Sequence, residues 1–237
     1  MSTINLLYAK QYAINNSIRI VIPTVGQILG NEDAYYSLVS IFTAMPIDLM
    51  CQLDDVGIDF TSINEYELFL LMFEGLKSQD TSLIFDNLDL SKFKVVVNGQ
   101  NGSIVLFDSE HNIIIDRAIY NQIASVLRRI HHLEKNNRKP ANNEARDYML
   151  KRAREKMRRK NRKEESYLES LIIAMVNTEQ YKYNFEGTKN LTIYQFNESV
   201  KQIVKKVDYD KRMIGVYAGT VNIKELSQDD LNWLIHK

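Results

Sequence analysis

The chain has 237 residues, of which 45% are hydrophobic, and its 30 Lys and Arg residues balance its 30 Asp and Glu residues. This composition is ordinary for a globular protein of one large domain or two small ones. The single cysteine, Cys51, excludes a disulfide framework within the chain and fits a reducing compartment. No stretch approaches the length of a membrane-spanning apolar run, and the start of the chain lacks a secretory pattern, so we expect neither a membrane span nor export.

Positive charge is concentrated in residues 128–163, which we call the basic segment. It contains 15 of the 30 Lys and Arg residues and only four acidic residues, a net charge of +11. The residues before it carry a net charge of −9, and those after it carry −2. The neutrality of the whole chain therefore hides a basic middle between acidic ends.

The first third of the chain predicts a β-hairpin followed by short helices. Two β-prone runs within residues 8–22 flank Asn15-Asn16, a pair that tolerates a tight turn. Pro23 ends the second strand, and Thr24 with Gln27 has the spacing of a capping box at a helix start. Further helices are expected at residues 32–42, 46–53 and 64–77, the last of them capped by Ser62 with Glu65.

A second group of β-prone runs precedes a strongly patterned helix. Residues 92–97 and 103–107 flank a glycine-containing loop that predicts a hairpin, and residues 111–116 predict a third strand. Residues 118–133 carry apolar side chains at helical spacing. The predicted fold class is therefore α+β, with residues 1–135 as a domain of small antiparallel sheets and helices.

The basic segment predicts a largely solvated helix. Pro140 interrupts the pattern, and Asn142 or Asn143 can cap a new helix that runs to about residue 163. Its apolar stripe is narrow, consisting of Met149, Ala153 and Met157, whereas a core helix needs a wider one. We therefore expect residues 136–163 to form a basic connector helix.

Residues 164–237 predict a C-terminal helical domain. A strongly apolar helix is expected at residues 167–176, and Thr192 with Gln195 predicts another capped helix start. Residues 181–191 between them predict a loop. Ser227 with Asp230 has the spacing of a cap for one or two final helical turns.

No group of residues in the sequence predicts catalysis, a metal site or a cofactor site. The HxxxH, CxxC, phosphate-loop, dinucleotide and nucleophile-elbow patterns are missing from the sequence. His131 lies one helical turn from Glu134, and an acidic group surrounds Gly57, but helix ends explain both. We expect a protein that is not an enzyme and that uses no metal or cofactor.

The basic segment itself allows three interpretations. It can be a solvated face that folds over the acidic N-terminal domain, it can bind an acidic protein partner, or it can bind nucleic acid through its Lys and Arg side chains. Only Tyr148 supplies an aromatic ring for base stacking within its helix.

The segment IRIVIPTVGQIL resembles the opening of tail assembly proteins and chaperones of tailed bacteriophages. Those proteins commonly begin with a β-hairpin that leads into a Pro-Thr-x-Gly-x-hydrophobic helix start, here Pro23, Thr24, Gly26 and Ile28. The resemblance covers about a tenth of the chain. It implies no catalysis, and it implies a protein of the infected bacterial cytoplasm that binds other tail components, such as the tape-measure or tube protein.

The leading prediction is therefore a non-enzymatic, chaperone-like tail assembly protein. A nucleic-acid-binding phage protein that acts through residues 128–163, and a structural virion component of the tail or neck, stay open as alternatives. Methionine adapts to varied surfaces, so the predicted partner-binding residues are the methionines of the basic helix and the neighbouring arginines: Met149, Met157, Arg154, Arg158, Arg159 and Arg162.

Overall fold

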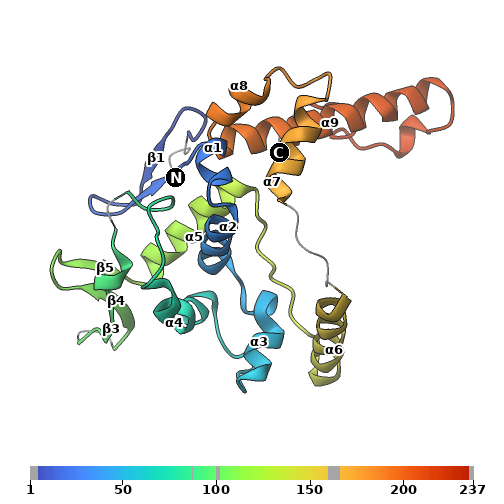
Figure 1. Ribbon diagram of the computed structural model, residues 1–237. Helices are drawn as coiled ribbons and strands as arrows, with labels where there is room; N and C mark the ends of the chain where they lie inside the picture. The colour runs from blue at the N-terminus through green and yellow to red at the C-terminus, as the bar shows by residue number, and fades with distance from the viewer. Residues whose placement is uncertain (1–4, 87, 100–101, 160–165, 235–237) are drawn as a thin grey trace.

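The computed structural model describes residues 5–86, 88–99, 102–159 and 166–234, without the side chain of Arg159. The described part is an α+β protein with two small antiparallel sheets and a larger set of helices (Figure 1). The strands are β1 (Gln11–Ala13), β2 (Arg19–Val21), β3 (Lys94–Val97), β4 (Ile104–Asp108) and β5 (Ile113–Ile115). The α-helices are α1 (Val25–Leu29), α2 (Glu32–Thr43), α3 (Met50–Asp55), α4 (Glu65–Leu76), α5 (Arg117–His131), α6 (Asn143–Arg159), α7 (Tyr167–Val176), α8 (Phe185–Asn190) and α9 (Ile193–Tyr217). Short 3-10 turns are η1 (Pro46–Leu49), η2 (Leu90–Lys92) and η3 (Ile223–Glu225).

Both predicted sheets are confirmed. In the first hairpin Tyr12 lies opposite Ile20, and the second sheet has the strand order β3-β4-β5 with Val96 opposite Val105. The tyrosine hydroxyl of Tyr66 on α4 donates to the carbonyl oxygens of Ile104 and Ile115, at 3.1 and 2.9 Å, which ties this sheet to the helices.

The motif that carries the tail-protein resemblance has a structural role. Thr24 and Gln27 form the predicted capping box of α1, and Thr192 and Gln195 form an equivalent box at the start of α9. The two helix starts lie side by side, because the Val25 N–H donates to the Leu191 carbonyl at 2.9 Å and the Ile193 N–H donates to the Pro23 carbonyl at 2.8 Å.

Gly26 is required at this junction because α8 approaches it closely. A Cβ atom at Gly26 would lie 2.6 Å from Cγ of Lys189 and 3.2 Å from its carbonyl oxygen. Real side chains do not tolerate the first of these distances without a shift, so the glycine of the motif permits the contact between α1 and α8.

One main hydrophobic core runs from Leu6 to Phe196 and takes in residues of both sheets and of helices α1, α2, α4, α5, α7 and α9, with Tyr181 and Leu191 on either side of α8. It therefore includes residues on both sides of the predicted boundary at residue 164. A smaller second cluster joins Ala44, Ile47, Leu53, Phe60, Leu68 and Leu150. The division into domains at 1–135, 136–163 and 164–237 stays a prediction.

Three local predictions need correction. Residues 181–191 were expected to be a loop, but they contain α8, whose start is capped by the Asn184 side chain. The cap of α4 is Asn64 with Glu67, not Ser62 with Glu65. Ser227 and Asp230 form the predicted hydrogen bonds, but turns rather than a helix follow them.

Helix α9 extends well beyond the main core. Across the top of Figure 1 its second half projects as an arm, with the segment after it folded back alongside. Arg212 pairs with Asp230 at 2.5 Å, and the Lys206 ammonium lies 5.4 Å from the Trp233 ring. No residue from 197 to 234 is fully buried, so this arm has little core of its own.

No helix of the described residues has the length and apolar character that crossing a membrane requires.

Candidate functional site

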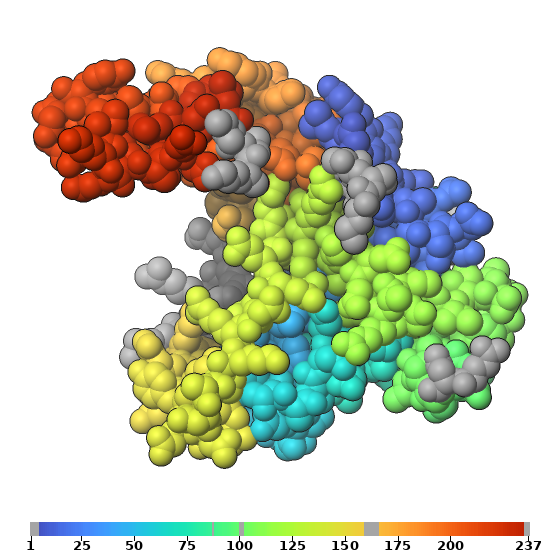
Figure 2. All heavy atoms as spheres, turned by 180° about the vertical axis from the view of Figure 1, so that it is seen from behind, coloured from blue at the N-terminus to red at the C-terminus, as the bar shows by residue number. Residues whose placement is uncertain are grey.

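The basic segment divides into three parts in the structure. Its described residues begin at the end of α5, continue as an irregular strap over residues 133–142, and then form α6. Figure 2 shows the strap, in yellow-green, running past the blue and cyan part of the chain towards α6, in yellow. The positive charges of the segment therefore lie in different surroundings, and each part has its own partners.

The first part anchors the segment through a nearly buried carboxylate. Glu65, at the start of α4, accepts hydrogen bonds from Arg128 at 3.0 Å and from Lys135 at 2.5 Å. The side chains of Glu65 and Arg128 are each only 10% exposed. Arg128 also donates to the carbonyl oxygen of Thr43 at 2.7 Å. Because a buried charge is costly without such partners, this network fixes the end of α5 against α4.

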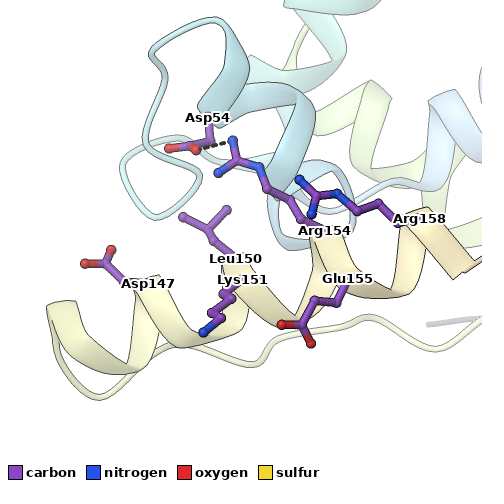
Figure 3. Close-up of a pocket in the computed structure, with 7 residues that line it drawn as sticks. All are labelled: Asp54, Asp147, Leu150, Lys151, Arg154, Glu155 and Arg158. Carbon is purple, nitrogen blue, oxygen red and sulfur yellow. Dashed lines mark hydrogen bonds and ion pairs between the residues drawn. The ribbon is translucent and has the colours of Figure 1, made fainter.

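One face of α6 docks on an acidic surface of the N-terminal part. Arg146 pairs with Asp59 at 2.6 Å, and Arg154 pairs with Asp54 and Asp55 at 2.6 and 2.7 Å. These two arginines lie eight positions apart, so they share one side of the helix. Figure 3 shows Arg154 directed towards Asp54, with Leu150 beneath the same contact. The positive segment thus folds over acidic residues of its own chain, as one interpretation of the sequence predicted.

Leu150 supplies the apolar part of this contact. It is 7% exposed and belongs to the second hydrophobic cluster, against which Met149 also packs. The apolar stripe predicted from the sequence did not include Leu150, although Leu150 lies four residues from both Arg146 and Arg154. The arginine stems on either side of a leucine were the signal that could have identified the docking face.

Hydrogen bonding strengthens the acidic side of the contact. The Thr61 backbone N–H and hydroxyl, followed by the Arg146 guanidinium, hold the pKa of the Asp59 carboxyl below its usual range. Nearby, burial raises the pKa of the Cys51 thiol, which keeps it protonated at neutral pH.

The predicted partner-binding residues occupy different positions. Arg154 and Met149 face the body of the protein, through the ion pairs and the second cluster respectively. Met157 is 53% exposed and Arg158 is exposed. Arg159 is the last residue of α6, and its side chain lies outside the described atoms, as does all of Arg162.

The opposite side of α6, which we call the outward face, consists of exposed residues of both charges: Glu144, Tyr148, Lys151, Arg152, Glu155 and Lys156. The Tyr148 ring is 60% exposed, and the Arg152 guanidinium lies 5.8 Å from its centre. Met157 and Arg158 instead continue the docking side, because Met157 lies two turns after Leu150 and Arg158 lies one turn after Arg154 and lines the same pocket. In the described part of the chain neither Arg158 nor any cation of the outward face forms an ion pair with another residue. The docking side is therefore ion-paired up to Arg154 and exposed beyond it.

A second candidate region is a cavity of about 760 Å³ where α2, the end of α5, α7 and α9 meet. Burial lowers the pKa of His131 to about 4, with a further contribution from His132, and the His131 Nε2 atom lies 2.9 Å from the Tyr35 hydroxyl. His132 has the left-handed backbone conformation (φ 53°) that ends α5, and burial also lowers its pKa. The Glu32 carboxylate caps α7 by accepting from the Leu168 N–H at 2.9 Å and from the Ser166 hydroxyl.

Within the described residues, no three His, Cys, Asp or Glu side chains come close enough together to hold a metal ion. What the structure offers is a set of surfaces: a docked helix with exposed charged residues, and an arm with exposed apolar residues.

The fold and these surfaces define an α+β protein with a basic helix docked on an acidic face. Residues 159–236 match the family model described as the YomV second domain, a phage-associated family. The match covers a third of the chain and includes α7, α8, α9 and the returning segment. No curated protein and no solved structure is significantly similar to the chain.

Proposed function

We propose that the protein is a non-enzymatic, chaperone-like phage tail assembly protein that binds other tail components in the cytoplasm of the infected bacterium. The phage-associated match of residues 159–236 supports the setting, and the N-terminal hairpin with its Pro-Thr-x-Gly helix start supports the assembly role. The single observation that carries the proposal is that the docking side of α6 is ion-paired up to Arg154, whereas Met157 and Arg158 continue it as exposed side chains.

In this proposal the residues of α6 have two roles. Arg154 and Leu150 position the helix, and Met157 with Arg158 contacts the partner. Methionine suits such a contact because its flexible side chain adapts to irregular surfaces, and arginine can pair with partner carboxylates.

The arm formed by α9 would add apolar contacts. Ile214 is 67% exposed and Tyr217 is 84% exposed, and both lie within the phage-associated region. Exposed apolar residues without a burying partner in the same chain are typical of protein interaction sites.

Co-expression with the tape-measure and tube proteins of the same phage tests the proposal. We expect at least one of them to co-purify with the tagged protein, and we expect the protein to be missing from purified phage particles. Failure of both to co-purify would contradict the proposed function. A fixed number of copies in purified particles would instead identify a structural virion component.

Nucleic-acid binding is a second candidate, which Tyr148 and its neighbours favour. An exposed ring beside Lys151, Arg152 and Lys156 could combine base stacking with phosphate contacts. This function predicts a steep loss of oligonucleotide binding between about 50 and about 200 mM salt. Salt-insensitive or undetectable binding would exclude it.

A further inference from the structure

The irregular strap, residues 133–142, forms one wall of a pocket that no part of the proposed function uses. The pocket has a volume of about 410 Å³, and we call it the strap pocket. Its other walls come from η1, from the residues that lead into α4, and from the starts of α5 and α6. It lies beside the docking face of α6, not on the outward face.

The floor of the strap pocket is apolar. Pro46, Ile47 and Phe60 are buried there, and Met45 and Ile63 are half-buried beside them. Such a floor favours an aliphatic or aromatic side chain of a ligand, because its burial removes apolar surface from water.

The rim of the strap pocket is cationic. Arg117, Arg138 and Lys139 are exposed along it, and none of them forms an ion pair with another residue in the described part of the chain. The pocket's carboxylate, Glu65, does not neutralise this rim, because it is already engaged by Arg128 and Lys135.

Arg117 adds a cation to the rim from a different element. It is the first residue of α5, directly after the N-cap Asp116, whose carboxylate accepts a hydrogen bond from the Ile119 N–H at 2.8 Å. The Arg117 side chain itself is exposed and forms no ion pair with another described residue, so its charge is available to a ligand.

The strap also offers backbone groups to a ligand. Within the described residues, the Asn137 N–H donates to the Lys135 carbonyl at 3.1 Å, and no other backbone N–H of residues 134–141 donates to a backbone carbonyl. An extended peptide laid along the strap could accept from these free N–H groups, as in other peptide-binding grooves.

From these observations we infer that the strap pocket binds a short acidic peptide segment of a partner protein, with one apolar side chain on the floor and carboxylates at the rim. Arginine pairs well with carboxylates through two parallel hydrogen bonds. A nucleic acid fits less well, because the one aromatic ring of the floor, Phe60, is only 5% exposed and presents no open face for base stacking.

The test uses the full chain and a fluorescein-labelled peptide of sequence Asp-Glu-Leu-Asp-Glu-Phe, followed by fluorescence anisotropy. Three labelled controls accompany it: the same peptide with Lys in place of each acid, the acidic peptide with Ser in place of Leu and Phe, and a short single-stranded DNA. We expect saturable binding of the acidic apolar peptide and binding at least about tenfold weaker for every control.

Paired variants locate the binding. The double substitution Arg138→Ala with Lys139→Ala removes two rim charges, and Lys151→Ala with Lys156→Ala removes the same charge from the outward face of α6. We expect the first pair to weaken peptide binding by about tenfold or more and the second by less than about twofold. Arg117→Ala, on a different element, should also weaken binding. All five side chains are exposed, so circular dichroism should show that the variants remain folded.

Three outcomes would overturn the inference. They are no saturable binding of the acidic peptide, equal loss of binding in the two double variants, and single-stranded DNA that binds as tightly as the peptide and loses affinity on the same rim substitutions. The first would leave the strap pocket without this ligand, the second would indicate diffuse attraction to positive charge, and the third would identify a nucleic-acid site.

Discussion

Acidification should destabilise the protein through His131, because its ring is buried in the neutral form. Burial holds the pKa of His131 at about 4, whereas an unfolded chain has the ordinary value of 6.5. Between these values the unfolded state binds a proton that the folded state does not bind, so the free energy of unfolding falls as the pH falls through this window. Above about pH 7 the contribution of His131 to the pH dependence of the free energy of unfolding is close to zero.

The size of the effect follows from the two pKa values. Their difference corresponds to roughly 3 kcal/mol once the pH is below about 4, and to roughly 2 kcal/mol at about pH 5. The groups around the ring do not offset this loss. Tyr35 and Tyr36 stay neutral in this range because burial raises the pKa of each, and His132 disfavours the protonated form of His131.

Urea unfolding of the wild type and of His131→Gln at about pH 7, 6 and 5 measures the effect. Glutamine can accept the hydrogen bond of Tyr35 but does not titrate, so the variant removes the pH dependence of this one group. We expect the wild type to lose roughly 2 kcal/mol more than the variant between about pH 7 and pH 5. Parallel curves for the two proteins, or an NMR titration that places the pKa of His131 near 6.5, would refute the reasoning.

Three substitutions test the packing that positions the candidate surfaces. Glu65→Ala should cost about 3 kcal/mol in a thermal or urea melt, because it leaves the Arg128 charge buried without its carboxylate; a loss below about 1 kcal/mol would show that water replaces the pair. Leu150→Ala should release α6 at a local cost of about 2 kcal/mol, seen as faster hydrogen exchange in α6 while the main core is unchanged; unchanged exchange would mean that the ion pairs alone hold the helix. Gly26→Val should destabilise the protein by about 1–3 kcal/mol in a urea melt, because the new side chain collides with Lys189. An unchanged free energy of unfolding would show that Lys189 of α8 moves aside at little cost.

The sequence predicted those elements whose signals are local. Thr24 and Thr192 each sit three residues before a glutamine, and both capping boxes are present. The hairpins, the α5 stripe and the α+β class were also predictable, because turn residues and apolar spacing act within a few positions. Helix α8 was missed because it is only six residues long and its start depends on a single N-cap, the side chain of Asn184.

The arrangement of the candidate site was only partly predictable. The sequence showed that positive charge gathers in residues 128–163, and the spacing predicted a helix within it. It did not show that Arg154 would meet Asp54, a residue 100 positions earlier, because such a pairing depends on the path of the whole chain. The strap pocket could not be predicted from the sequence for the same reason, because its rim combines Arg117 with residues of a strap that has no periodic pattern.

The most direct test of the account compares the two faces of α6 in partner binding. Tape-measure or tube protein is co-expressed with the wild type, with a double variant that combines Met157→Ser and Arg158→Ala on the docking side, or with Arg152→Ala, which removes the same charge from the outward face. The account predicts that the first variant loses at least about tenfold in recovered partner, that Arg152→Ala loses less, and that both keep the stability of the wild type. Full recovery of the partner by the double variant would contradict the claim that the exposed end of the docking side of α6 contacts the partner.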